Sequence, residues 1–395
     1  MREIKDIAIV GAGLGGLTSA IALRRQGFNA TVYEQSSSLS EIGAGVQLSP
    51  NAMKVLRALG LEDEFRKISF EPDRHVVRSW KSGRVISATQ MKNVYEREFG
   101  SGYFGAHRAD LHKLLAHALP EGTIRLNANC IDVGTVDNHA VLKFTDGAEI
   151  RADIAVGADG IHSNVRNCLF GKESPRFTGN VCWRGLVPVE DVPKGMFAPD
   201  MTVWFGPNSN VVHYYVRGGK LINWVASHES DWSTESWRSE ASIAEVVEAY
   251  KDWHPDLTKL FAATKHCYKW ALFDRSPLSN WSKGRVTLLG DSAHAMLPYL
   301  AQGACMAIED AFALASSLAA DRQEPNAALE RYEGLRRDRA SRVQSAANAR
   351  AKVNHLTSRW ARLKRDTAYA WRKLIKPSSH TYQIEWIYGY DVTKE

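Results

Sequence analysis

A glycine-rich turn after a short apolar run constrains this chain more than any other feature. Ile7–Val10 has the length of a buried strand, and Gly11-Ala-Gly13-Leu-Gly15-Gly16 follows it directly. Gly11 permits the tight turn, Gly13 lets the backbone approach a pyrophosphate, and Gly16 lets the next helix pack closely on the strand. The pattern predicts a strand, a turn and a helix whose N-terminus binds phosphate.

A second strand completes the unit. Residues 29–34 read Asn-Ala-Thr-Val-Tyr-Glu and end on Glu34. A carboxylate at this place can accept hydrogen bonds from both ribose hydroxyls, and it repels a 2′-phosphate. We therefore expect an adenine dinucleotide without that phosphate. The unit alone does not separate FAD from NAD.

The composition is that of a globular chain long enough for two domains. The 395 residues are 44% hydrophobic and 24% charged. No apolar run approaches the ~20 residues of a membrane span, and the start does not resemble a signal peptide. We expect a cytoplasmic protein. The five cysteines have no metal-binding spacing, so reduced thiols and no metal are expected; they are Cys130, Cys168, Cys182, Cys267 and Cys305.

The net charge of +6 is unevenly distributed. Residues 331–376 hold many Lys and Arg on a helical pattern. A solvated face or a seam between subunits explains such a stretch better than nucleic acid, because no nucleic-acid motif accompanies it.

The order of expected elements indicates one domain interrupted by another. The chain starts as α/β, becomes β-rich with many aromatics, and returns to α/β before a helical tail. Helices are expected at 51–67, 108–118, 241–252, 256–263, from 303 onward and through much of 325–372. We expect β-structure as a meander at 123–156, a β-rich stretch at 176–228 and a strand at 285–290.

Two further motifs narrow the ligand to FAD. Gly157-Ala-Asp159-Gly160-Ile-His-Ser-Asn-Val-Arg follows an apolar strand, and Gly284-Arg-Val-Thr-Leu-Leu-Gly290-Asp291-Ser-Ala-His lies far downstream. With the first glycine turn, they resemble in content and order the motifs of the flavoprotein aromatic hydroxylases, the family of para-hydroxybenzoate hydroxylase. The resemblance covers nearly the whole chain.

The resemblance to the flavoprotein aromatic hydroxylases implies an FAD site formed by residues of several segments. Asp291 would bind the ribityl and pyrophosphate region, and Asp159 would hold its own loop. The helix after Gly303 would aim its N-terminus at the flavin edge that becomes anionic on reduction. The full implied set of cofactor-binding residues is Gly11, Gly13, Leu14, Gly16, Glu34, Val46, Gln47, Arg108, Cys130, Asp159, Asp291, Pro298, Gly303 and Ala304.

Local strings such as Gly43–Gln47 and Gly102-Tyr103-Phe104 resemble one branch of the family. This branch holds salicylate 1-hydroxylase, 3-hydroxybenzoate 6-hydroxylase and 6-hydroxynicotinate 3-monooxygenase. The resemblance implies that NADH or NADPH reduces FAD transiently and that O₂ is captured as a C4a-hydroperoxide. The substrate would be a small hydroxylated aromatic carboxylate in a dry pocket.

One segment carries most of the catalytic candidates. If residues 203–216 contain a strand, Asn210, Val212, Tyr214 and Val216 share one face, and His213 shares the other with Tyr215. Tyr214 matches the aromatic residue of the branch, whereas Asn210 replaces its usual histidine and cannot act as a base. A bulge or a one-residue shift would turn His213 inward instead.

Three other residues are candidates with structural alternatives. Tyr103 matches a substrate-side tyrosine of the 3-hydroxybenzoate enzyme but could be core. Arg184 could pair a carboxylate bidentately or hold a domain interface. Gln47 replaces a histidine of the hydroxynicotinate enzyme, which argues against that substrate.

We therefore expect a Rossmann-like α/β FAD-binding domain interrupted by a β-sheet substrate domain. The expected FAD-binding ranges are 1–72, 105–175 and 268–325, and the substrate ranges are 73–104 and 176–267. A helical segment, 326–395, is expected to form a homodimer contact, because exposing Trp386, Tyr388 and Tyr390 would be costly. Alternatives are a decarboxylating hydroxynicotinate-type enzyme, a flavin dehydrogenase without oxygen insertion, and a flavin-binding scaffold.

Overall fold

Three parallel strands that are far apart in the sequence are neighbours in the first sheet. The computed structural model describes residues 3–39, 43–234, 239–375 and 383–395. Residues 1–2, 40–42, 235–238 and 376–382 fall within the expected domain ranges and lie outside the described residues. The sheet has the order β19-β20-β12-β1-β2-β8. Its strands are β1 (Asp6–Val10), β2 (Asn29–Tyr33), β8 (Ile124–Arg125), β12 (Ile154–Gly157), β19 (Ser282–Lys283) and β20 (Val286–Leu288).

This order brings the three glycine motifs together. β1, β12 and β20 run parallel in adjacent positions, so their carboxyl ends meet at one edge of the sheet. Gly11, Asp159 and Asp291 each follow one of these strands. Ligands of open parallel sheets bind at such an edge, which places the motifs around one binding region.

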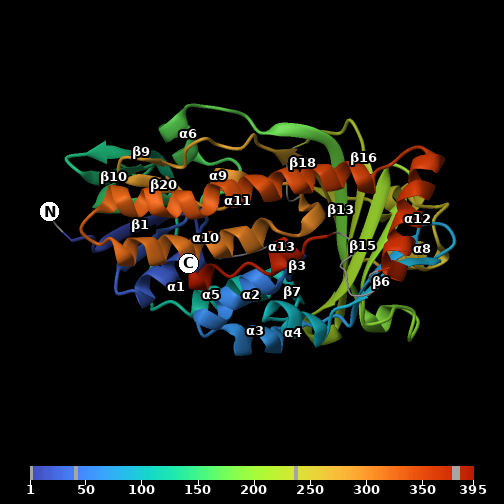
Figure 1. The fold of residues 1–395 in the computed structure, drawn as a ribbon. Helices are drawn as coiled ribbons and strands as arrows, with labels where there is room; N and C mark the ends of the chain where they lie inside the picture. Colours follow the sequence, from blue (N-terminus) through green and yellow to red (C-terminus); the bar gives the residue numbers. More distant parts are fainter. Residues whose placement is uncertain (1–2, 40–42, 235–238, 376–382) are drawn as a thin grey trace.

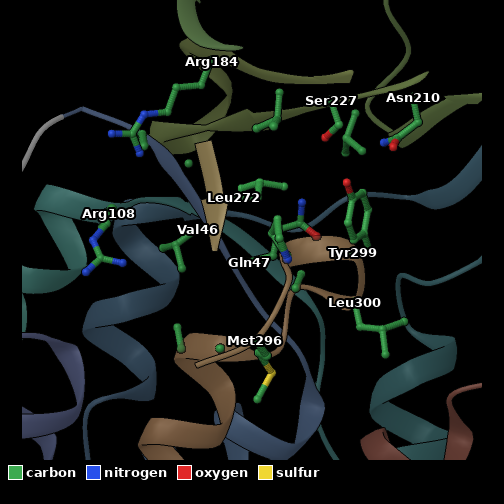
Figure 2. Close-up of a pocket in the computed structure, with 18 of the residues that line it drawn as sticks. Val46, Gln47, Arg108, Arg184, Asn210, Ser227, Leu272, Met296, Tyr299 and Leu300 are labelled. Atoms are coloured by element: carbon green, nitrogen blue, oxygen red, sulfur yellow. The ribbon is translucent and has the colours of Figure 1, made fainter. Parts of the chain in front are cut away.

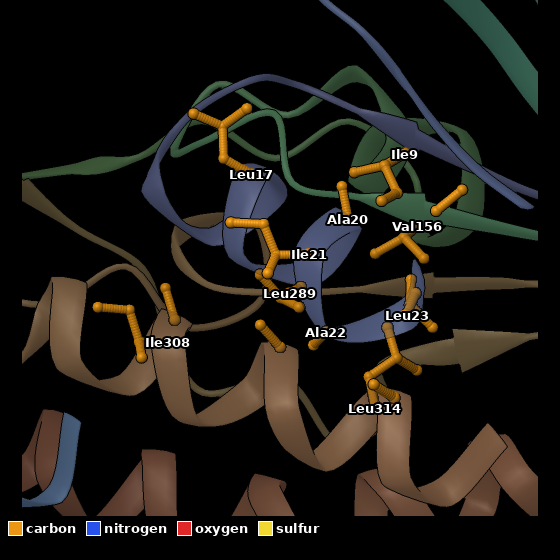
Figure 3. Packing of buried hydrophobic residues seen from close by; sticks show 14 of the residues in the cluster. Ile9, Leu17, Ala20, Ile21, Ala22, Leu23, Val156, Leu289, Ile308 and Leu314 are labelled. Carbon is orange, nitrogen blue, oxygen red and sulfur yellow. The ribbon is translucent and has the colours of Figure 1, made fainter. Parts of the chain in front are cut away.

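Helix α1 (Leu14–Arg25) is held closely between β1 and α10 (Gly303–Ala320). A Cβ on Gly16 would lie 2.0 Å from the carbonyl oxygen of Gly11, and one on Gly15 would lie 2.7 Å from a methyl carbon of Leu289. Figure 3 shows Leu17 and Ile21 of α1 among the buried side chains of the sheet and of α10. The small residues of the motif thus set the spacing of the helix from the strand.

The second sheet has eight strands in the order β17-β18-β13-β16-β15-β14-β5-β6. Helices α7 (Ile243–Ala249) and α8 (Pro255–Ala262) pack on one face of it with an aromatic core that includes Trp224, Tyr250 and Trp253. Its strands are β5 (Arg74–Ser79), β6 (Val85–Gln90), β13 (Arg176–Pro188), β14 (Met201–Gly206), β15 (Ser209–Val216), β16 (Leu221–Glu229), β17 (Glu240–Ala241) and β18 (Cys267–Asp274).

The remaining elements connect and cover the two sheets. Figure 1 shows α11, a long helix beside α10, running from the first sheet toward the second. Two small sheets have the orders β11-β10-β9 and β3-β7-β4. Their strands are β3 (Gly45–Leu48), β4 (Ser69–Phe70), β7 (Phe104–His107), β9 (Cys130–Val136), β10 (His139–Phe144) and β11 (Glu149–Ala152). The other helices are α2 (Pro50–Ala58), α3 (Glu62–Ile68), α4 (Val94–Phe99), α5 (Arg108–His117), α6 (Asn164–Phe170), α9 (Asp291–His294), α11 (Pro325–Asn354), α12 (Arg359–Ile375) and α13 (Glu385–Tyr388), with 3₁₀ turns η1 (Val189–Asp191), η2 (Arg217–Gly219), η3 (Pro298–Leu300) and η4 (Val392–Lys394).

The mixed α/β fold expected from the sequence is confirmed, with two local corrections. The helical pattern at 51–67 is two helices, α2 and α3, because Gly60 between them takes a left-handed φ of 62°. The expected meander is β9–β11, whereas β12 leaves it and joins the first sheet.

Helix α10 is the one helix among the described residues that is long and apolar enough to cross a membrane. It is instead 67% buried within the fold, and it packs between α1 and α11. Its apolar composition is therefore that of a central core helix.

A cluster of fully buried charges joins α10 to α11. Arg336 of α11 pairs with Glu309 (2.5 Å) and Asp310 (2.8 Å), and all three side chains are buried completely. Burial works to raise the pKa of both carboxyls. It is outweighed by Arg336 and Arg339 at Glu309, and by His294 and Arg336 at Asp310, so both pKa values lie below their ordinary range. Asp310 also accepts a hydrogen bond from the Gly290 amide (3.1 Å) and contacts His294 (2.5 Å).

We expect Arg336→Leu to destabilise the fold by about 3–5 kcal/mol, because it removes the buried cation that Glu309 and Asp310 share, and leaves Glu309 with Arg339 alone (2.8 Å). Arg337→Leu is the matched control: the Arg337 side chain is 37% exposed and pairs with Glu333 at 3.3 Å, so the cost should stay below about 1 kcal/mol. Urea denaturation measures both. Since the native pKa values are lowered, the difference should be present near neutral pH and shrink as pH falls through them. Equal costs for the two variants would contradict this account.

Candidate functional site

The carboxyl edge of the first sheet holds a cavity of about 570 Å³. The turns after β1, β2 and β12 line this cavity. In open parallel sheets this is where the nucleotide end of a dinucleotide binds. The expected cofactor residues that line it are Gly11, Gly13, Glu34, Arg108, Cys130 and Asp159.

The residues of this cavity form a preorganised cradle. Glu34 accepts hydrogen bonds from the amides of Ala12 (2.8 Å) and Ser36 (2.9 Å), so the acid at the end of β2 holds the glycine turn. Gly11 has a φ of 103°, and a Cβ there would lie 2.5 Å from the Ala158 carbonyl oxygen. A Cβ on Gly13 would meet nothing within 4 Å, which leaves its backbone open to a ligand.

Asp159 has the loop-holding contacts expected of it. Its carboxylate accepts hydrogen bonds from the Ser163 hydroxyl (2.5 Å) and the Val165 amide (3.1 Å) at the start of α6. Burial raises the pKa of this carboxyl, although these hydrogen bonds act in the opposite direction. Asp159 thereby fixes the turn between β12 and α6.

A second cavity, of about 330 Å³, lies between the two sheets. Arg108 and His162 line both cavities, so one elongated ligand can extend from the nucleotide end into the second cavity. On the side of the first sheet, the lining includes the expected residues Val46, Gln47, Asp291, Pro298, Gly303 and Ala304. The backbone of Gly303 and Ala304 is the start of α10, whose free N–H groups favour an anion.

These features fit FAD as the resemblance predicted it. The two cavities together supply a phosphate-binding helix end, an acid at the second strand, and a second helix N-terminus at the far part of the ligand. Leu14 and Gly16 do not line either cavity. Leu14 is 4% exposed in the core because its side chain turns away at the start of α1, and Gly16 acts on the spacing of α1 instead.

Strand β15 places its alternate residues as the pattern predicted. Asn210, Val212 and Tyr214 line the second cavity, and the strand pairs with β14 and β16 without a register shift. His213 lies on the other face, where its ring is 4.4 Å from that of Phe197. Burial, with Arg78, lowers the pKa of His213 to about 3. The alternative that turned His213 into the cavity is therefore corrected.

Two tyrosines converge on Gln47. The Tyr103 hydroxyl donates to the side-chain oxygen of Gln47, and the Tyr214 hydroxyl is hydrogen-bonded to the same side chain. Burial raises the pKa of Tyr214, although the hydrogen bond with Gln47 acts in the opposite direction, so its phenol is neutral. Tyr214 also lies against Gly45, where a Cβ would come 2.4 Å from its hydroxyl.

Arg184 brings a cation to the same cavity. It is 6% exposed, lines the cavity, and stacks its guanidinium on Trp270 at 4.3 Å. Figure 2 shows it on the opposite side of the view from Asn210 and Ser227, with Leu272 and Gln47 between them. The cavity is therefore basic toward one side.

Several residues that line this cavity were not expected there from the sequence, among them Tyr388, which was expected at a dimer contact. They include Tyr299, Ser227, Leu272, Asn354, Ile384 and Tyr388. Tyr299 directly follows Pro298, so the motif that contains Pro298 could have indicated it. Ser227 lies two residues after Val225 on the same face of a strand, so alternation could have indicated it. Asn354 has no local signal, because it comes from the end of α11.

The comparisons with known proteins agree with this geometry. Residues 5–347 match the FAD binding domain family. The 3-amino-4-hydroxybenzoate 2-monooxygenase PtmB3 of Streptomyces platensis is 36% identical and spans 98% of this chain and 96% of its own. The 6-hydroxynicotinate 3-monooxygenase of Pseudomonas fluorescens is 37% identical over 99% and 96%. The structure of a salicylate hydroxylase substrate complex is similar with a TM-score of 0.82, 26% identity, and coverage of 99% and 97%.

We expect Asp291→Ala to lose bound FAD while the chain stays folded. Removing a charged hydrogen-bond partner costs roughly 2–3 kcal/mol, which is about a hundredfold in affinity. The ratio of flavin to protein absorbance after gel filtration measures occupancy, and circular dichroism checks the fold. Asp338→Ala, at a side chain that is 87% exposed, is the control. A variant at Asp291 with full flavin content would contradict the assignment.

Proposed function

Because the chain belongs to the FAD-dependent aromatic hydroxylases, we propose that it hydroxylates a small hydroxylated aromatic carboxylate. The reductant is NADH or NADPH, which binds transiently, and the second substrate is O₂. The observation that carries the proposal is the second cavity, where the start of α10, Gln47 and Tyr214 meet one buried cation, Arg184. Salicylate and the hydroxybenzoates have the size and groups for it.

The protein's part in the reaction is to bind, orient and exclude water. FAD, when bound, supplies the activation of O₂. Arg184 pairs with the substrate carboxylate, and Tyr214 with Gln47 holds the ring hydroxyl. Apolar walls keep water from the reacting face; they include Met201, Val203, Val212, Val225 and Leu272.

Three alternatives predict other results. A decarboxylating hydroxynicotinate-type reaction gains support from a relative of that name, but Gln47 and Asn210 stand where histidines were expected. A dehydrogenase would reduce an acceptor without inserting oxygen, and a scaffold would bind flavin without turnover. The purified protein should oxidise NADH rapidly only when an aromatic carboxylate is added, and product analysis identifies the ring position. NADH oxidation that no salicylate, hydroxybenzoate or hydroxynicotinate stimulates would contradict the proposal.

Tyr214→Phe should lower the rate of hydroxylation by about ten- to a hundredfold with FAD content unchanged. The variant keeps the ring and removes a hydrogen bond to substrate worth roughly 1.5–3 kcal/mol. Part of the NADH used should then appear as hydrogen peroxide, because the ring is misplaced.

Tyr215→Phe is the matched control for this variant. Tyr215 is the next residue of β15, and its hydroxyl donates to the Phe197 carbonyl (2.9 Å) outside the cavity. It loses one hydrogen bond as well, yet hydroxylation and coupling should stay near wild type. Equal effects of the two variants would contradict a role of the Tyr214 hydroxyl in holding the substrate.

The homodimer remains part of the proposal, and the proposed contact stays within the expected segment 326–395, on α12 rather than on the aromatic terminus. Tyr388 is buried within its own chain, and Trp386 and Tyr390 lie under Arg342 and Arg339. The apolar face of α12 points outward instead, with its large side chains 49–79% exposed; they are Trp360, Leu363, Trp371, Leu374 and Ile375. Their spacing makes one helical stripe that a second copy could cover. We also expect a cytoplasmic location, consistent with five free cysteines.

Light scattering should give a particle of twice 44.0 kDa, and Trp371→Glu should convert it to the monomer. A charge placed in the stripe must be desolvated for the two copies to meet. Phe170→Glu changes an exposed aromatic of α6 and should leave the dimer intact. A wild-type particle of 44.0 kDa would contradict the proposal.

A further inference from the structure

The second cavity has a polar end formed by four segments. Asn210 of β15, Ser227 of β16, Tyr299 of η3 and Asn354 at the end of α11 all line it. Each side chain is more than nine-tenths buried. Figure 2 shows Asn210, Ser227 and Tyr299 on one side of the view, with the Tyr299 oxygen toward Ser227. These four residues are called the amide end below.

The amide end is held in place from behind. His355 contacts the side-chain oxygen of Asn210 through Nε2 at 3.0 Å, and its ring meets that of Tyr299 edge-on at 5.3 Å. The Ser227 hydroxyl lies 3.0 Å from the sulfur of Cys182. The geometry is therefore fixed before any ligand enters.

The amide end carries no charge. Asn210, Ser227 and Asn354 do not ionise, and burial raises the pKa of Tyr299. Burial, together with His228, lowers the pKa of His355 to about 4, so its imidazole is neutral at pH 7. A carboxylate placed here would lose its hydration without meeting a cation, whereas Arg184 offers one on the other side of the cavity.

Two buried atoms of this end have no hydrogen-bond partner among the described residues: the Tyr299 hydroxyl, which can donate or accept, and the Asn354 side-chain oxygen, which only accepts. An unpaired buried polar atom costs about 1–3 kcal/mol. A donor on the ligand would satisfy the Asn354 oxygen, and a second carboxylate would not, because both groups only accept.

From this geometry we propose that the amide end binds, through Asn354, an uncharged amino or hydroxyl substituent of the aromatic ring other than the hydroxyl that Tyr214 and Gln47 hold, while the ring carboxylate lies toward Arg184. The inference rests on the proposed function for the aromatic carboxylate. It adds the rule that the substrate carries a neutral donor on the side remote from its carboxylate, and it disfavours dicarboxylates, because the second carboxylate would meet no cation at the amide end.

Equilibrium binding to the FAD-loaded protein tests this without any turnover. The probes are benzoate, its amino and hydroxy derivatives at each ring position, and the benzene dicarboxylates, titrated against the flavin absorbance. The most tightly bound amino or hydroxy isomer should exceed benzoate in affinity by about tenfold or more. No dicarboxylate should bind more tightly than benzoate.

Variants at Asn354 assign the effect. Asn354→Leu should abolish the tenfold preference and change the affinity for benzoate by less than about twofold. Asn354→Asp keeps an acceptor at the same place and should retain the preference. Asn348→Leu removes another amide of α11, one that bonds Asp274 and does not line the cavity, and should leave the preference unchanged.

Equal affinities of wild type for benzoate and its derivatives, or tightest binding of a dicarboxylate, would overturn the inference even if a variant failed to fold. So would a preference that survives in Asn354→Leu. These measurements use no reductant, so they are separate from the test of the proposed function. If the protein shows the predicted binding preference but no hydroxylation, the inference about the amide end stands and the proposed monooxygenase activity is contradicted.

Discussion

The buried pairing of Arg336 with Glu309 and Asp310 is the constraint on which the site depends. Glu309 also accepts a hydrogen bond from Asn51 of α2 (2.6 Å), and Asp310 holds the loop that begins α9. The two adjacent acids thus join α2, α10, α11 and the turn after β20. Burying three charges is costly unless every one is paired, so this arrangement permits few alternatives and fixes the start of α10 beside Asp291.

The second cavity, which the start of α10 borders, has three polar regions of different chemistry. The start of α10 offers backbone donors, Arg184 offers a buried positive charge, and the amide end offers neutral hydrogen-bonding groups. Apolar side chains separate these regions, so each substituent of a small ring would meet one kind of partner. Orientation then follows from charge and hydrogen bonding rather than from the overall shape of the cavity, since wrong orientations leave buried groups unpaired.

The parts of the fold and site that could be predicted are those whose chemistry is local. Gly11 needs a left-handed backbone, the acid Glu34 ends a strand, and the faces of β15 follow from alternation, so each is written into a few neighbouring residues. The assignment of Leu14 to the cofactor stays a prediction: its side chain is buried in the core, and a helix N-terminus binds phosphate through backbone N–H groups. Asn354 could not be predicted, because its position depends on how the thirty residues of α11 pack across both sheets.

The most direct test of the account is the fate of isotopically labelled O₂ during turnover with an aromatic carboxylate that binds the FAD-loaded protein. The account predicts that one labelled oxygen atom enters the ring of the product for nearly every NADH consumed, as shown by mass spectrometry. NADH oxidation that yields only labelled hydrogen peroxide, or product oxygen that comes from water, would contradict the assignment of this site as an aromatic hydroxylase.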